Sequence, residues 1–171
     1  MKRIMTIILI LLSFNGFIFS QSVPKFKLTK DGMKPVVITF DTSYSAHLIY
    51  TKVKEWIKSN SKHPESLIRI DTENSLVKFS FYKDKAWKLK TNGTDIWNEM
   101  QYTFTIDIKK AKCRVTFATD EVRYKVWYNK DGSLNKKFKD SEASFENTVN
   151  ETLTSLYNYL KNTKKKTTDD W

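Results

Sequence analysis

The chain is poor in the residues on which several classes of protein depend. It has a single cysteine, Cys113, which excludes an intramolecular disulfide and a cysteine-based metal cluster. Its two histidines, His47 and His63, have no carboxylate neighbour at metal-ligand spacing, so we expect no metal and no cofactor. Four scattered glycines build neither a phosphate-cradling loop, nor a dinucleotide fingerprint, nor a nucleophile elbow. These shortages leave few routes to catalysis.

What is present fits one globular domain. The chain has 171 residues, of which 40% are hydrophobic and 29% are charged. This balance is neither that of a disordered segment nor that of a fibrous repeat. The length corresponds to one ordinary domain.

The first 20 residues have the pattern of a secretory signal peptide. Lys2 and Arg3 precede an apolar run over residues 4–12, and the small residue Ser20 follows. We predict cleavage after Ser20 and a secreted or periplasmic protein. The alternative is an uncleaved membrane anchor. However, the whole stretch over residues 4–19 is shorter than the ~18–20 apolar residues that a membrane span needs.

The chain is strongly basic. Its 30 lysines and arginines against 19 acidic residues give +11, and losing Lys2 and Arg3 with the signal peptide leaves 28 against 19, or +9. Such a charge favours an acidic glycan, an anionic membrane surface or nucleic acid, and export argues against nucleic acid. The alternative is that the lysines serve only solubility.

The domain is expected over residues 34–162. Residues 21–33 form a polar lead-in with a short strand at 25–29, and residues 163–171 form a loose basic and polar tail. Apolar residues at steps of three and four predict helices at 44–59 and 141–160. We expect residues 41–43 to cap the first helix, and Asp140 or Ser141 to cap the second.

Alternating apolar and polar residues predict the strands. They fall at 35–40, 67–71, 77–82, 102–108, 113–117 and 122–127, with a turn at Asn92-Gly93 in a less regular stretch over 83–100. This pattern is typical of an antiparallel sheet with one apolar and one polar face. Two helices must cover the apolar face. The prediction is therefore an α+β two-layer sandwich, with about five or six strands and two helices on one face.

The polar face of this sheet is the candidate binding surface. Cations beside exposed aromatic rings can hold an acidic ligand or stack on a sugar ring. Threonines at 103, 105 and 116 share the face, and its candidate binding residues are Arg69, Lys78, Tyr82, Arg114, Arg123, Lys125 and Trp127. Two alternatives stay open: an ordinary solvated sheet face, or a Trp127 covered by residues 83–100 together with Trp87 and Trp97.

Two carboxylates and the thiol are the remaining chemical candidates. Asp71 and Asp107 are expected on the same polar face, where a hydrolase would need them about 5–10 Å apart across a cleft. Salt pairs with neighbouring strands explain them more simply. Cys113 alternates in phase with Val115 and Phe117, which predicts a buried thiol rather than a nucleophile.

Four stretches carry a resemblance to a known family. They are the helix at 48–57 with Tyr50 and Trp56 on one face, the strand at 68–71 with its partner at 77–81, the strand at 102–108, and the strand at 113–117 followed by the C-terminal helix. Together they resemble the exported bacterial domain of unknown function with a TATA-binding-protein-like (TBP-like) fold. The match covers about residues 35–160. Where the family pattern has glycine, residues 72–75 and 83–87 have none.

The resemblance implies export and a TBP-like fold, but no activity, because none is attached to the family. The leading interpretation is an exported, non-enzymatic binding or interaction domain of the cell envelope, whose partner is a protein, a glycan or another anionic envelope component. The alternatives are an envelope hydrolase that uses the carboxylates of the polar face, and a module attracted to anionic envelope surfaces by its charge.

Overall fold

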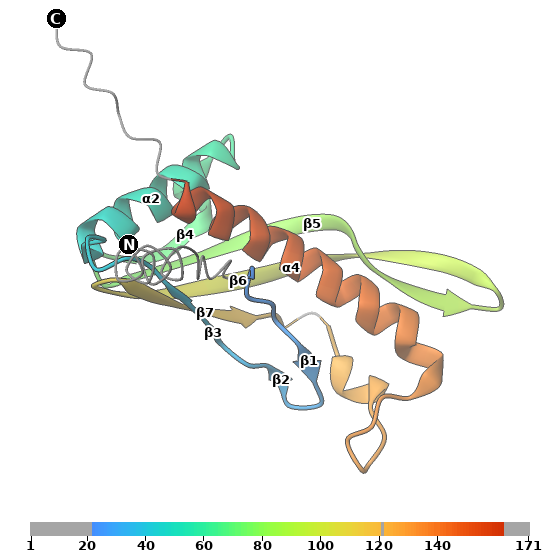
Figure 1. The fold of residues 1–171 in the computed structure, drawn as a ribbon. Helices are drawn as coiled ribbons and strands as arrows, with labels where there is room; N and C mark the ends of the chain where they lie inside the picture. Colours follow the sequence, from blue (N-terminus) through green and yellow to red (C-terminus); the bar gives the residue numbers. More distant parts are fainter. Residues whose placement is uncertain (1–21, 121, 163–171) are drawn as a thin grey trace, which may run out of the picture.

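A computed structural model describes residues 22–120 and 122–162 (Figure 1). The predicted signal peptide and the predicted tail over 163–171 lie outside the described residues. The main sheet is antiparallel and has five strands, in the order β3 (Val36–Thr39), β7 (Lys112–Ala118), β6 (Thr94–Lys109), β5 (Leu76–Thr91) and β4 (Ile68–Thr72). The predicted antiparallel sheet is confirmed.

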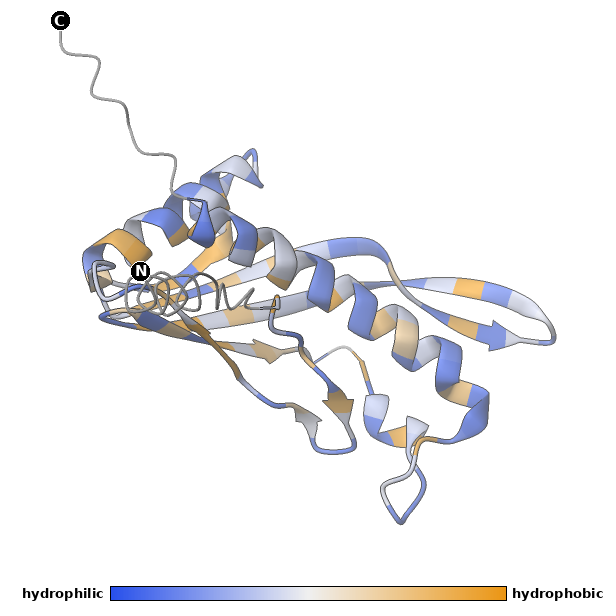
Figure 2. Cartoon of the chain, viewed as in Figure 1, coloured by the Kyte–Doolittle hydropathy of each residue, from blue (hydrophilic) through white to orange (hydrophobic). Residues whose placement is uncertain are grey.

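Two long helices lie on the same side of this sheet (Figure 1). They are α2 (Ala46–Ser59) and α4 (Lys139–Lys161), and a single turn, α3 (Pro64–Leu67), leads into β4. Figure 2 shows hydrophilic and hydrophobic residues alternating along α4, as expected of a helix that buries one face. The two-layer α+β architecture is therefore confirmed.

Both predicted helix caps are wrong. The α2 helix is capped by Ser45, whose Oγ accepts a hydrogen bond from the Leu48 amide at 3.0 Å. Residues 41–43 instead belong to a turn closed by the Tyr44 amide, which donates to the Asp41 carbonyl. The α4 helix begins at Lys139, directly after the 3₁₀ turn η2 (Lys136–Phe138), so Asp140 and Ser141 already lie in its first turn.

The core lies between the helices and one face of the sheet. Phe79, Phe104 and Val115 of the sheet are fully buried there, together with Trp56 of α2 and Phe145 of α4. The Trp56 indole also donates from Nε1 to Ser155 Oγ of α4 at 3.1 Å. The two helices and the sheet thus share one apolar interior, whose burial is the main source of stability.

The β5 and β6 strands continue through residues 83–100, a stretch for which the sequence pattern predicts only the turn at Asn92-Gly93. Each strand has 16 residues, and their predicted turn is confirmed: Asn92 and Gly93 have φ values of 51° and 81°. A register shift between Lys83 and Trp87 interrupts the pairing. The α4 helix packs on this hairpin, where Thr148 Oγ1 donates to the Ala86 carbonyl. The hairpin extends beyond the other strands in Figure 1.

The predicted strand at 122–127 is wrong. After β7 ends at Ala118, the chain forms the 3₁₀ turn η1 (Tyr124–Trp127), and Trp127 is buried. The lead-in also contributes to the fold. Its short hairpin pairs β1 (Leu28–Thr29) with β2 (Gly32–Met33), and the Phe26 amide donates to Asn150 Oδ1 of α4 at 2.7 Å. Within the described residues, no helix is long and apolar enough to cross a membrane.

Candidate functional site

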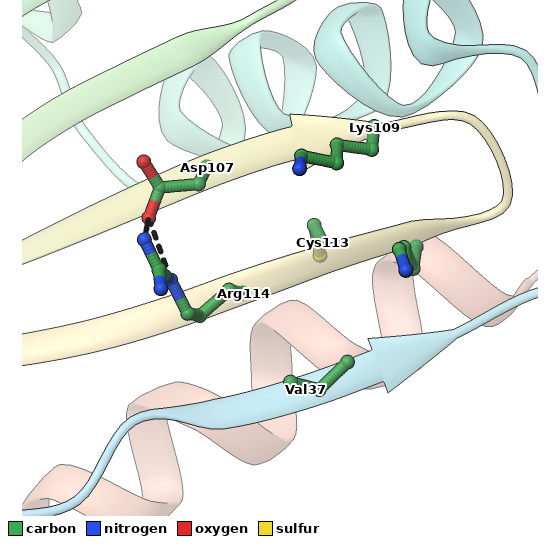
Figure 3. A pocket seen from close by; sticks show the side chains of 6 residues that line it. Val37, Asp107, Lys109, Cys113 and Arg114 are labelled. Atoms are coloured by element: carbon green, nitrogen blue, oxygen red, sulfur yellow. Dashed lines mark hydrogen bonds and ion pairs between the residues drawn. The ribbon is translucent and has the colours of Figure 1, made fainter.

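The side of the main sheet that faces away from α2 and α4 is called the open face here. Strand pairing aligns Thr116, Thr105 and Lys78 in one row across β7, β6 and β5. The next row holds Val37, Arg114 and Asp107 from β3, β7 and β6. Figure 3 shows both helices behind the strands that carry these side chains. The open face therefore presents cations and hydroxyl groups.

A hydroxyl-rich hollow lies on the open face. It has a volume of about 290 Å³ and is lined by Lys78, Gln101, Thr103, Thr105, Ala118, Thr119 and Asp120. Two of its hydroxyl groups, those of Thr103 and Thr119, form local hydrogen bonds. Thr103 Oγ1 lies 2.9 Å from Ser80 Oγ, and Thr119 Oγ1 donates to the Gln101 carbonyl at 2.8 Å. The hollow offers both donors and acceptors to a polar ligand.

A basic hollow lies at the end of the same face, next to the β6–β7 turn (Figure 3). Its volume is about 250 Å³, and its lining residues are Val37, Asp107, Lys109, Lys112, Cys113 and Arg114. Arg114 donates from Nε to Asp107 Oδ2 at 3.0 Å, and its Nη2 lies 2.9 Å from the same oxygen. The single carboxylate of the hollow is therefore already paired.

Lys109 and Lys112 are the two remaining cations of the basic hollow. They lie directly opposite each other in the register of β6 and β7. Among residues 22–120 and 122–162, neither lysine forms an ion pair. The turn between them is fixed, because the Ala111 amide donates to the Tyr44 carbonyl at 2.9 Å and its carbonyl accepts from the Phe40 amide. Two lysines without an ion-pair partner among the described residues thus occupy paired positions of the two strands.

The thiol of Cys113 borders the basic hollow from the core side. Cys113 is buried, as predicted, and burial raises the pKa of its thiol to about 12. At neutral pH the sulfur is therefore protonated. A nucleophilic thiol needs a lowered pKa and access to solvent, and Cys113 has neither.

Three of the predicted binding residues lie on the open face: Lys78, Tyr82 and Arg114. Tyr82 pairs with Gln101 in the strand register, is 61% exposed, and donates its hydroxyl hydrogen to Glu99. Arg69 is exposed at an irregularity of the edge strand β4. The structure thus brings together only part of the predicted surface.

The other three predicted binding residues, Arg123, Lys125 and Trp127, are not on the sheet. Arg123 and Lys125 are exposed around the η1 turn. Trp127 turns into the core, where its ring centroid lies 5.2 Å from that of Trp87 and 5.8 Å from that of Phe145. The placement of Trp127 on the polar face is therefore wrong. The alternative is correct in that Trp127 is covered beside Trp87, but Trp97 does not join them, because it is 49% exposed.

The expectation that Asp71 and Asp107 share a face is also wrong. A register shift between Ile68 and Ile70 places Ile70 opposite Lys78 and Asp71 opposite the buried Val77. The Asp71 carboxylate therefore faces α2, where it pairs with Lys54 and accepts from the Tyr50 hydroxyl at 2.7 Å. Burial raises the pKa of Asp71, but these two hydrogen bonds lower it more, and the net shift is downward.

Sequence analysis missed Lys109, Lys112 and Val37. A usable signal was present, since Lys109 continues the alternation of Asp107 along one strand and Lys112 that of Arg114 along the next. The predicted strands end at residue 108 and resume at residue 113, so both lysines fall between them instead of at the strand ends. His47 and His63 are exposed, and His47 Nδ1 lies 3.0 Å from Asn74 Oδ1. The described residues contain no group of three metal-ligating side chains.

One sheet face covered by two helices and the other left open define a TBP-like α+β fold. The chain is similar in structure to a DUF4468 family protein from Bacteroides ovatus, with a TM-score of 0.50 and 13% identity over 84% of this chain and 92% of that one. It is also similar to a TBP-like protein from Parabacteroides distasonis, with a TM-score of 0.52 and 11% identity over 75% of this chain and 92% of that one.

These likenesses show the fold alone. The resemblance to a TBP-like domain of unknown function is confirmed at that level. No family model matches the sequence, and no curated protein matches it.

Proposed function

We propose that the chain is an exported, non-enzymatic binding domain of the cell envelope, and that its open face holds an anionic partner. The observation that carries this proposal is the basic hollow, where Lys109 and Lys112 lie opposite each other in the strand register, without an ion-pair partner among the described residues. Like charges placed directly across a strand pair are destabilising, so an anion bound between them would lower the free energy of the folded state.

The hydrolase alternative loses its structural support. Asp71 and Asp107 lie on opposite faces of the sheet, and each forms an ion pair, with Lys54 and Arg114 respectively. A pair of catalytic carboxylates must flank the same bond of a substrate, which these two residues do not do.

Export is the part of the proposal that depends on the N-terminal pattern. The test is to express the full chain in a Bacteroides host, to separate envelope and culture medium from cytoplasm, and to sequence the N-terminus of the recovered protein. A chain that starts within a few residues of Gln21 in the exported fraction supports export. An intact Met1 in the cytoplasm contradicts it.

The binding face can be tested by photocrosslinking in intact cells. A photoreactive phenylalanine analogue is placed at position 105 on the open face and, as a matched control, at position 147, which is exposed on the outer side of α4. The proposal expects adducts from position 105 and none from position 147. Adducts from position 147 alone, or equally from both positions, would contradict an open binding face.

A further inference from the structure

We propose, resting on the function proposed above, that the partner is an acidic glycan. Its anionic group, a carboxylate or a sulfate, binds in the basic hollow, and its neutral sugar hydroxyls bind along β6 in the hydroxyl-rich hollow. Three observations support this ligand: the charge of the basic hollow, the size of the basic hollow, and the chemistry of the hydroxyl-rich hollow.

The donor groups of the basic hollow fit an oxyanion. The Lys109 and Lys112 ammonium groups are donors only, and Arg114 uses two of its five N–H groups on Asp107. Three cations and one carboxylate leave a local excess of two positive charges. A carboxylate or sulfate oxygen can accept hydrogen bonds from these groups. Its negative charge also offsets the repulsion between the two lysines.

The size of the basic hollow fits one charged group of a larger ligand. Its volume of about 250 Å³ is below the ~300–1,000 Å³ of pockets that enclose a whole drug-sized molecule. Val37 is 54% exposed at its border and offers an apolar surface to the C–H groups of a sugar ring. The rest of the ligand must therefore lie outside this hollow, on the sheet surface.

The side chains of the hydroxyl-rich hollow suit the neutral hydroxyl groups of a sugar. Hydroxyl and amide side chains at Gln101, Thr103, Thr105 and Thr119 both donate and accept hydrogen bonds, as sugar hydroxyls do. Asp107 of the basic hollow and Thr105 of this hollow are two residues apart on β6, or about 7 Å at ~3.4 Å per residue, whereas Lys109 and Thr103 are six residues apart, or about 20 Å. A ligand that contacts both Lys109 and Thr103 is therefore an extended chain rather than a single sugar.

A lipid surface fits the same features less well. A bilayer presents its charges in a plane, and proteins that bind it insert protruding apolar or aromatic side chains at the headgroup level. On the open face the cations and hydroxyl groups line hollows, and the exposed apolar side chains do not form one patch: Val37 borders the basic hollow, Ile70 lies on the edge strand β4, and Tyr82 lies at the far end of the face. Binding to vesicles is therefore the competing outcome of the test.

The experiment measures equilibrium binding of the purified full chain at 0.15 M salt to matched polymers. Polygalacturonate is compared with its methyl ester, and dextran sulfate with dextran, so that the members of each pair share a sugar backbone and differ in whether it carries anionic groups. Vesicles containing phosphatidylglycerol form the last arm. The proposal expects saturable binding to at least one acidic polymer, at least tenfold tighter than to its uncharged counterpart. Comparing the affinities for polygalacturonate and dextran sulfate shows whether the chain binds a carboxylate or a sulfate more tightly.

The variant that tests the site is Lys109→Gln with Lys112→Gln. It should weaken binding to the acidic polymer at least tenfold without lowering the melting temperature, because it removes a like-charge pair. The matched control is Lys130→Gln with Lys136→Gln, which removes the same charge from exposed positions before α4 and should change affinity less than twofold. Lys109→Gln alone is the second variant, with an intermediate loss.

Equal losses in the two double variants, or binding to the vesicles and to no acidic polymer, would overturn the proposal. These outcomes are distinguishable from failure of the proposed function. If position 105 still crosslinks a partner in cells while every glycan arm is negative, the open face is a binding surface for a different ligand, and only the glycan inference falls.

Discussion

Trp127 and Trp97 have opposite environments. Trp127 is 3% exposed and packs against Trp87, Phe138 and Phe145, whereas Trp97 is 49% exposed on β6. Strand alternation extrapolated past Ala118 places Trp127 on the polar face. The chain instead leaves the sheet there and turns over the core, so the alternation no longer determines which way the side chain points.

The first prediction follows from this contrast. Trp127→Ala should lower the free energy of unfolding by about 3–5 kcal/mol, because it removes a large buried ring and leaves a cavity. Trp97→Ala, the matched control, should change it by no more than about 0.5 kcal/mol, as is usual for exposed positions. Urea unfolding of both variants measures the difference. A loss for Trp127→Ala as small as the one expected for Trp97→Ala would show that Trp127 is not a core residue.

The edge strand β4 is fixed to the helix layer by a polar contact. Its register shift between Ile68 and Ile70 turns the Asp71 carboxylate toward Lys54 and Tyr50 of α2. These hydrogen bonds hold the pKa of Asp71 below its ordinary value, despite an opposing effect of burial. A carboxyl group with a lowered pKa in the folded state stabilises that state only while it is ionised.

The second prediction concerns the pH dependence of this contact. Its stabilisation should be fully present above the unfolded-state pKa of about 3.9 and should disappear as the pH falls through the lower folded-state pKa. Asp71→Asn should therefore cost about 0.5–1 kcal/mol at pH 7, and this difference from the unmodified chain should shrink toward zero below pH 3. Urea unfolding at pH 7, 5, 3 and 2 measures it.

The control is Asp84→Asn, at an exposed carboxylate that forms no ion pair among the described residues. Its effect on unfolding should be small and nearly independent of pH. A cost for Asp71→Asn that is equally large at pH 3 would show that the carboxylate does not act through its charge.

Whole elements were more predictable from the sequence than their irregularities. The three- and four-residue apolar steps located α2 and α4, because only residues such as Ile49, Val53 and Leu153 on one helix face reach the core. The β5–β6 extension was missed because the register shift after Lys83 breaks the alternation, and Lys85 adopts a positive φ of 51° that no sequence signal marks. The basic hollow was missed for a different reason: it depends on register, since Lys109 and Lys112 become neighbours only when the two strands pair.

At the scale of the whole molecule, aromatic contacts join the two ends of the core. Trp56 of α2 contacts Phe79 at 5.8 Å between ring centroids, and Phe79 contacts Phe104 at 5.9 Å. Phe104 contacts Phe117 at 6.2 Å, which contacts Phe145 of α4 at 5.7 Å. Phe145 in turn contacts Trp127. No polar layer interrupts this series, so the region around α2 and the region around η1 have no separate cores.

The third prediction is that these two regions unfold together. A continuous core of this size favours a single cooperative transition, in which no partly folded state is populated. The chain labelled with 5-fluorotryptophan gives separate fluorine NMR signals for Trp56 and Trp127, each assigned by a Trp→Phe substitution. Their native intensities should disappear with the same urea midpoint. The exposed Trp97 serves as the internal comparison, because its ring is 49% exposed and is not one of the buried core residues. A lower midpoint for Trp127 than for Trp56 would show that η1 and the first half of α4 form an independent unit, and that the contacts between Phe117 and Phe145 do not couple them to the sheet.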